Sequence, residues 1–184
     1  RHRKGVDILI KAFSEVSQRY TEMFLLLVGP KNLVENPSLD ESYIKGLIRL
    51  IDEKQLAGRV KFTGLVKNRE TMADLYQAAD LFVFPSRNEG LGNVVLEAMS
   101  TGLPVIVSEL PVLKNVITHG ENGWFVPIGD EQGFINGISY LIENSEIASL
   151  LGREARRFTQ NYHNFESWQS VLVKIYKNLH EQYS

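Results

Sequence analysis

Residues 84–99 read FPSRNEGLGNVVLEAM, and this stretch decides the fold of the chain. It follows a short apolar run, Leu81 to Phe84, which predicts a buried strand, and it opens a helix whose apolar positions recur at helical spacing. Two glycines lie in the loop between strand and helix, with one glutamate on either side of them. Parallel α/β proteins use a strand, a Gly-rich loop and a helix N-terminus in this order to hold phosphate.

The composition of the 184 residues is ordinary for a globular domain, with 43% hydrophobic and 23% charged residues. The formal net charge of -2 argues against nucleic acid as a partner, because such proteins carry basic surfaces. The chain has no cysteine, which excludes disulfides and thiolate metal sites, and no spacing of His, Asp and Glu indicates another metal site. No apolar run approaches the roughly 20 residues of a membrane-spanning helix.

Short apolar strands and helices alternate along most of the chain. Strands are predicted at about residues 23–28, 60–63, 81–84, 105–107 and 124–126. Helices are predicted at about residues 6–20, 40–55, 69–79, 92–99, 112–118, 130–143, 146–162 and 165–182. This alternation predicts an α/β fold with a Rossmann-like, doubly wound parallel sheet and flanking helices. Such a unit begins with a strand, whereas the first predicted element is a helix, so we expect the strand before Arg1 to be missing from this sequence.

The loop before the helix has the features of a diphosphate site. Gly92, Asn93 and Val94 lie where the helix starts, and the unpaired N–H groups and the dipole of a helix N-terminus favour an anion. Gly90 and Gly92 allow a ligand to approach the backbone closely. Lys4, which precedes the first helix, can add a positive charge to the same site.

The two glutamates indicate hydroxyl groups on the ligand. Glu97 is within reach of a ligand at the helix N-terminus and can accept two hydrogen bonds from ribose, while Glu89 can accept from a sugar ring. The sequence therefore predicts a nucleotide joined to a sugar. The alternatives are structural: Glu89 interacts only with the helix dipole, Glu97 is a solvated helix residue, and Lys4 is an ordinary surface lysine. Arg87 either forms a salt bridge with Glu89, which is the structural alternative, or contacts the ligand.

The run from Glu89 to Glu97, EGLGNVVLE, resembles the paired-glutamate signature of the group 1 retaining glycosyltransferases, which have the GT-B fold. Further stretches resemble the same family in the same order, at residues 4–13, 60–64, 79–86, 102–106 and 120–124. The resemblance covers nearly the whole chain. One departure lies at Asn115, where many members of the family carry a glutamate.

The resemblance implies a role for each matching position. Glu89 would be the catalytic residue and would hold the donor sugar together with the backbone of Gly90, Leu91 and Gly92. The other positions would hold the nucleotide: the diphosphate by Lys4, Asn93 and Val94, the ribose by Glu97, and the base by Leu65 and Val66.

The family resemblance also implies the activity. We expect transfer of a sugar, with retention of configuration and without a metal or other cofactor, from a UDP or GDP sugar to a saccharide or lipid-linked glycan. Residues 1–184 would form the donor-binding domain, and the N-terminal acceptor domain would be absent, together with an arginine ligand of the diphosphate. We expect this fragment alone to be inactive.

The resemblance also implies that the enzyme is cytoplasmic, acts in polysaccharide biosynthesis and associates peripherally with the inner face of the membrane. Two other functions stay open at this point. One is a regulatory module that binds a nucleotide or phosphosugar without catalysis. The other is a sugar-nucleotide epimerase of the same fold, although the paired glutamates fit a transferase better.

Overall fold

The computed structural model of the chain describes residues 2–163, 169, 172–178 and 180. The strands are β1 (Leu25–Val28), β2 (Val60–Gly64), β3 (Phe82–Phe84), β4 (Val105–Ser108) and β5 (Trp124–Val126). The helices are α1 (Val6–Arg19), α2 (Glu41–Glu53), α3 (Arg69–Ala78), α4 (Asn93–Ser100), α5 (Glu131–Glu143) and α6 (Ser145–Tyr162), with short 3-10 helices η1 (His2–Lys4) and η2 (Pro111–Leu113). The helix predicted at 165–182 lies partly outside the described residues, and 172–178 within it are helical.

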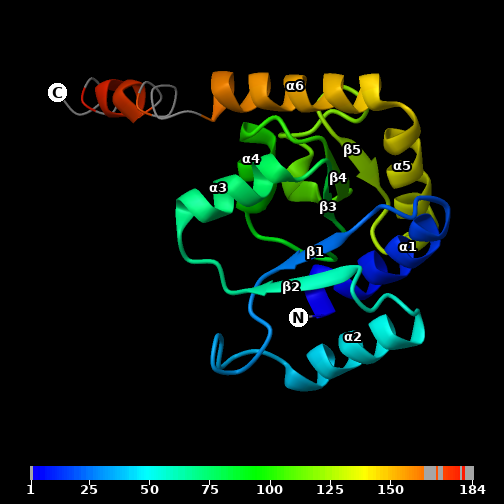
Figure 1. Cartoon of the computed structure of the whole chain (residues 1–184). Helices are drawn as coiled ribbons and strands as arrows, with labels where there is room; N and C mark the ends of the chain where they lie inside the picture. The colour runs from blue at the N-terminus through cyan, green and yellow to red at the C-terminus, as the bar shows by residue number, and fades with distance from the viewer. Residues whose placement is uncertain (1, 164–168, 170–171, 179, 181–184) are drawn as a thin grey trace.

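The ladders between these strands are all parallel, but the strands form two sheets (Figure 1). One sheet has the order β1-β2 and the other has the order β3-β4-β5. The common doubly wound sheet has the strand order 3-2-1-4-5-6. Here β2 and β1 correspond to strands 3 and 2 of that order, and β3, β4 and β5 correspond to strands 4, 5 and 6. No strand of the described residues fills the place between β1 and β3, which is why the predicted single sheet is observed as two.

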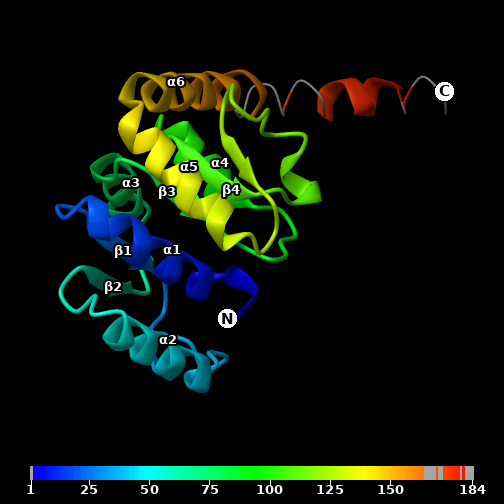
Figure 2. The same ribbon diagram turned by 90° about the vertical axis from the view of Figure 1, so that its right-hand side faces the viewer.

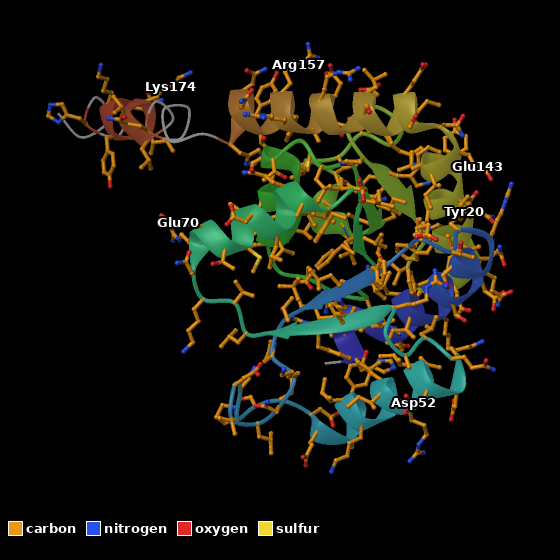
Figure 3. All side chains as sticks on the ribbon, viewed as in Figure 1. Tyr20, Asp52, Glu70, Glu143, Arg157 and Lys174 are labelled. Atoms are coloured by element: carbon orange, nitrogen blue, oxygen red, sulfur yellow. The ribbon has the colours of Figure 1, made fainter. Side chains whose placement is uncertain are left out.

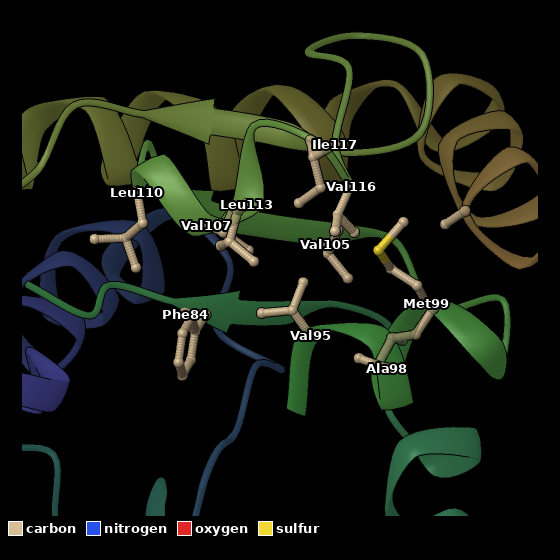
Figure 4. Packing of buried hydrophobic residues seen from close by; sticks show 12 residues of the cluster. Phe84, Val95, Ala98, Met99, Val105, Val107, Leu110, Leu113, Val116 and Ile117 are labelled. Carbon is tan, nitrogen blue, oxygen red and sulfur yellow. The ribbon is translucent and has the colours of Figure 1, made fainter. Parts of the chain in front are cut away.

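Helices cover both faces of the three-stranded sheet. Side chains of a strand point alternately to the two faces, and those of β4 accordingly pack in two different hydrophobic clusters. Val105 and Val107 pack against α4 and α6, where Figure 4 shows them facing Val95. Ile106, between them, packs on the opposite face against α1, α5 and the start of α6. Each residue of β4 is buried, as the continuous apolar run of the sequence predicts for a central parallel strand.

Helix α1 links the two sheets (Figure 2). Ile8, Ala12 and Val16 belong to the cluster under the three-stranded sheet. Leu9 and Phe13, on the neighbouring stripe of the same helix, pack against β1 and α2. The Rossmann-like α/β fold class predicted from the sequence is therefore confirmed, with α1 as the element shared between its two parts.

The helix boundaries follow local signals in the sequence. Asp40 caps α2 by accepting from the Tyr43 N–H, Asn68 caps α3, and Asp130 caps α5 by accepting from the Gly133 N–H. Along the outside of the molecule, charged side chains such as Asp52, Glu70 and Arg157 extend away from the core (Figure 3).

One predicted helix is shorter than expected. Only Pro111–Leu113 form a 3-10 helix in place of the helix predicted at 112–118. The buried side chain of Asn122 explains the early end, because its amide donates to the Val116 carbonyl and its oxygen accepts from the Thr118 N–H. In a continuing helix the Thr118 N–H would instead donate to the Lys114 carbonyl, so the side chain of Asn122 replaces a helical bond.

Candidate functional site

The candidate residues gather at one edge of the parallel sheets. The loop 85–92 follows the carboxyl end of β3, and Leu65 follows the carboxyl end of β2. Lys4 belongs to η1, which lies against the loop 85–92 through hydrogen bonds described below. Open α/β sheets bind ligands outside the carboxyl ends of their strands, so this edge is the expected place for a site.

The N-terminus of α4 is shaped by glycine. Gly92 is its N-cap residue with φ of 68°, and no side chain caps the helix within the described residues. A Cβ at Gly92 would lie 2.8 Å from Cδ2 of Leu113, a side chain of the buried cluster in Figure 4. A larger residue is therefore excluded both by the backbone conformation and by this contact. Gly90 and Leu91 are exposed, so the backbone of this loop is accessible to a ligand.

Lys4 and Glu89 are in direct contact. The Lys4 Nζ lies 2.6 Å from Glu89 Oε1, and the same oxygen accepts a hydrogen bond of 2.8 Å from the Ser86 hydroxyl. The ammonium also lies 5.2 Å from the centre of the Phe84 ring, a cation–π distance. The sequence predicts both residues as ligands of one molecule, and the structure brings them together across the start of the loop.

The pKa of the Glu89 carboxyl is set by opposing effects. Burial raises it, but hydrogen bonds from Lys4 and Ser86 and the charges of Lys4 and Arg3 outweigh burial, and the net pKa is lowered. Glu89 is therefore ionised at neutral pH. In that form it accepts hydrogen bonds and cannot serve as a proton donor.

Glu97 lies on the exposed side of α4 and contacts α3. Its carboxylate accepts a hydrogen bond of 3.2 Å from the Tyr76 hydroxyl, which also lies 3.3 Å from the Val94 carbonyl oxygen. Burial raises the pKa of Tyr76, and the charge of Glu97 raises it further, so the hydroxyl keeps its proton as the donor. The sequence did not indicate Tyr76, because its position in an amphipathic helix is equally typical of a core residue.

The structure adds Glu35 beside the predicted base-binding residues. Glu35 Oε2 accepts hydrogen bonds from the backbone N–H groups of Lys31 at 3.1 Å and of Leu65 at 2.9 Å. Leu65 is exposed and Val66 is half-buried. The pattern N-x-x-E at Asn32–Glu35 signals a local cap, since Asn32 Oδ1 accepts from the Glu35 N–H, but it gives no sign of the contact with Leu65.

Arg87 forms its ion pair with Asp7 and not with Glu89. Its guanidinium forms a bidentate ion pair with Asp7, in the first turn of α1, at 2.7 and 2.9 Å. Glu89, the partner considered from the sequence, pairs with Lys4 instead. This choice depends on the approach of η1 to the loop, which no local pattern reveals.

The described residues hold neither a metal-ligand cluster nor a membrane-spanning helix. No group of three or more His, Asp and Glu side chains is placed to hold a metal ion in the described part of the chain. Among the same residues, no helix is both long enough and apolar enough to cross a membrane.

Comparison with known proteins gives consistent matches. The sequence model of the family described as "Glycosyl transferases group 1" matches residues 1–158. The chain is 29% identical, over 182 residues, to D-inositol 3-phosphate glycosyltransferase of Corynebacterium urealyticum, covering 96% of the chain and 40% of that protein. It is 34% identical, over 186 residues, to sulfoquinovosyl transferase SQD2 of Arabidopsis thaliana, covering 99% of the chain and 32% of that protein.

Solved structures agree with these matches. Sucrose-phosphate synthase from Thermosynechococcus elongatus superposes with a TM-score of 0.85 at 30% identity, covering 99% of this chain and 44% of that one. Anabaena HepE in complex with UDP-glucose superposes with a TM-score of 0.82 at 26% identity, covering 98% of this chain and 46% of that one. The chain therefore spans less than half the length of each of these four proteins.

Proposed function

Since the chain belongs to the group 1 glycosyltransferases, we propose that it binds the nucleotide-sugar donor of an enzyme that transfers the sugar with retention of configuration. The observation that carries this proposal is the contact of Lys4 with Glu89 beside the uncapped N-terminus of α4. A cation, a helix N-terminus and a carboxylate at one point suit a ligand that joins a diphosphate to a polyol. The donor-binding domain would comprise residues 1–184.

The diphosphate would lie at the start of α4. Lys4 and the backbone N–H groups of Asn93 and Val94 would bind its oxygens. In the transfer, the bond between the anomeric carbon and a diphosphate oxygen breaks, and its electron pair leaves with the diphosphate. The acceptor hydroxyl oxygen forms the new bond to that carbon and releases its proton. A fixed ammonium and a helix N-terminus stabilise the charge that develops there. We propose that this replaces a metal ion, so chelation with EDTA should leave donor binding unchanged.

The sugar and the nucleoside would lie on opposite sides of the diphosphate. Glu89 and the backbone of Gly90, Leu91 and Gly92 would hold the sugar, and the ionised Glu89 would face the positive charge that develops at the anomeric carbon. The nucleoside would be held by Glu97 at the ribose and by Leu65 and Val66 at the base.

We propose a UDP sugar as the donor, with a GDP sugar as the alternative. The proposal is supported by Anabaena HepE, whose structure has been solved in complex with UDP and with UDP-glucose. The acceptor would be a saccharide or lipid-linked glycan bound by a further domain, and the enzyme would work in polysaccharide biosynthesis at the cytoplasmic face of a membrane. We expect residues 1–184 alone to bind the donor without turnover.

Calorimetric titration of residues 1–184 with UDP, GDP and ADP, each alone and as its glucose conjugate, tests the proposal. We expect one base to bind more tightly than the others and its sugar conjugate to gain affinity over the nucleotide alone. Absence of heat with every ligand at millimolar concentration would contradict the proposal. Equal affinity for nucleotide and conjugate would leave a nucleotide-binding regulatory module as the better description.

A further inference from the structure

Arg87 connects the loop after β3 to the segment that precedes α1. Its Nη1 donates to the His2 carbonyl at 2.7 Å and to Asp7 Oδ1 at 2.9 Å, and its Nη2 donates to Asp7 Oδ2 at 2.7 Å. Its backbone N–H donates to the Arg3 carbonyl at 2.7 Å. A single residue of the loop therefore holds the chain both before and after Lys4.

We propose that Arg87 is a positioning residue, which fixes Lys4 relative to Glu89 and so assembles the diphosphate site; this inference rests on the function proposed above. The Arg87 guanidinium is bonded to Asp7 and to the His2 carbonyl, so we expect it to hold the backbone around Lys4 in place and not to bind the diphosphate itself. Arginine suits this task because its planar fork matches a carboxylate with two parallel hydrogen bonds, which a lysine cannot form.

Asp7 is itself held in place from a second direction. The Tyr43 hydroxyl, from α2, donates to Asp7 Oδ1 at 3.1 Å. Burial raises the pKa of Asp7, but the hydrogen bonds and charge of Arg87 and the hydrogen bond of Tyr43 outweigh it, and the net pKa is lowered. Burial together with the charge of Asp7 raises the pKa of Tyr43 to about 12. The pair is therefore an ionised, part-buried bidentate contact, unlike an exposed ion pair of little consequence.

The backbone on both sides of Lys4 lies close against the loop. Before it, the Arg3 carbonyl accepts from the Arg87 N–H, and the Ser86 Oγ, whose proton goes to Glu89, lies 3.1 Å from the same carbonyl oxygen. After it, Gly5 has a φ of 66° and packs so tightly on the Pro85 carbonyl that no Cβ would fit. With its backbone held at both neighbours, the flexible Lys4 side chain reaches Glu89 at 2.6 Å. Substitution of Arg87 leaves these contacts in place and removes the three hydrogen bonds of its side chain, one to the His2 carbonyl and two to Asp7.

The first test measures the position of Lys4 without any ligand. Contact with Lys4, together with Ser86 and Arg3, lowers the pKa of the Glu89 carboxyl in the wild-type chain. NMR titration of the wild-type chain and its variants would measure this pKa. In R87Q we expect this pKa to rise toward the ordinary value, and we expect the same in K4M. D7N, which keeps the shape of its side chain, should raise it as well, and it serves if R87Q does not fold. A Glu89 pKa unchanged in folded R87Q or D7N would overturn the inference.

The matched control is R59Q. Arg59 also donates to backbone carbonyls, those of Ser17, Tyr20 and Met23, but it joins α1 and β1 to β2 away from the loop. We expect R59Q to lower the resistance to urea, as R87Q does, and to leave the pKa of Glu89 unchanged. If the Glu89 pKa changed as much in R59Q as in R87Q, Arg87 would be a residue that stabilises the fold in general and not one that positions Lys4.

The second test is a double-mutant cycle on UDP binding, measured by calorimetry. We expect R87Q and K4M each to weaken UDP roughly tenfold, the loss typical of a charge-assisted hydrogen bond. Because Arg87 would act through Lys4, the double variant should bind like K4M alone. Equal weakening by R87Q in the wild-type and K4M backgrounds would contradict the inference. If UDP does not bind the wild-type chain, the proposed function fails for this nucleotide, while the Glu89 titration still tests the role of Arg87.

Discussion

Lys4 and Glu89, which are 85 residues apart in the chain, form an ion pair with 2.6 Å between Nζ and Oε1. The side chain of Glu89 is 9% exposed and that of Lys4 is 37% exposed, so the carboxylate is the more buried partner and the lysine remains partly accessible. Lys4, expected to bind the diphosphate, and Glu89, expected to bind the sugar, are thus partners of each other. A bound diphosphate would have to share Lys4 with Glu89.

The lowered pKa of Glu89 makes stability depend on pH. Its stabilising contribution is fully present above its ordinary pKa of 4.5 and is lost as the pH falls through the lower pKa of the folded state. We therefore expect the wild-type chain to lose more unfolding free energy than E89Q between about pH 5 and pH 3. Urea denaturation at several pH values in this range measures the unfolding free energy of the wild-type chain and of E89Q. Asp7 and the other carboxyl groups are common to both chains, so parallel curves would show that Glu89 contributes nothing.

The proposed division of roles predicts different losses at the two glutamates. E97A should weaken UDP and UDP-glucose by the same factor, roughly tenfold, because the ribose is common to both ligands. E89A should leave UDP nearly unaffected and remove the gain in affinity that glucose contributes. Calorimetry with the two ligands separates these outcomes. Equal losses in both variants, for both ligands, would contradict the division.

Gly5 should tolerate no side chain. Its φ of 66° costs alanine about 1–2 kcal/mol, and the contact with the Pro85 carbonyl adds about 1–3 kcal/mol of overpacking. Gly58 is the matched control, with a φ of 81° and no atom within 4 Å of a Cβ among the described residues. G58A should therefore cost only the backbone part. Urea denaturation compares the two variants, and equal losses would show that the packing of Gly5 on Pro85 has no energetic weight.

Two fully buried serines should respond in opposite ways to alanine. The Ser86 hydroxyl contacts Glu89 and the Arg3 carbonyl, and S86A should cost about 1.5–3 kcal/mol, as for a hydrogen bond to a charged group. The Ser108 hydroxyl, at the end of β4, has no partner in the described part of the chain. S108A should therefore be neutral or stabilise by about 1 kcal/mol. Thermal unfolding of the two variants decides, and a large loss in S108A would indicate a partner for that hydroxyl.

The elements were predictable from the sequence where local patterns determine them. The run before Phe84 and the helix after Gly92 are correct within a residue or two, because apolar periodicity and glycine act over short distances. The helix predicted at 112–118 was wrong, because the side chain of Asn122, which lies outside that range, binds the backbone of Val116 and Thr118.

The contacts within the candidate site were less predictable. The sequence indicated Lys4, Glu89 and Glu97 by residue type and spacing, but the pairing of Arg87 with Asp7 depends on how η1 packs against the loop. Glu35 was missed because its contact with Leu65 spans 30 residues and crosses between two loops. Such contacts follow from the tertiary arrangement, and single-chain patterns carry no information about them.

The interruption between β1 and β3 affects how the domain behaves in solution. In the described structure each of these strands pairs along one edge only, and Leu26 and Val28 of β1 are 43% and 44% exposed. A strand edge with unpaired N–H and C=O groups and apolar side chains is a template for a strand of another molecule. Purified residues 1–184 should therefore self-associate as their concentration rises. A lysine in place of Leu26 would be expected to oppose this, since a charge on an open edge disfavours strand addition.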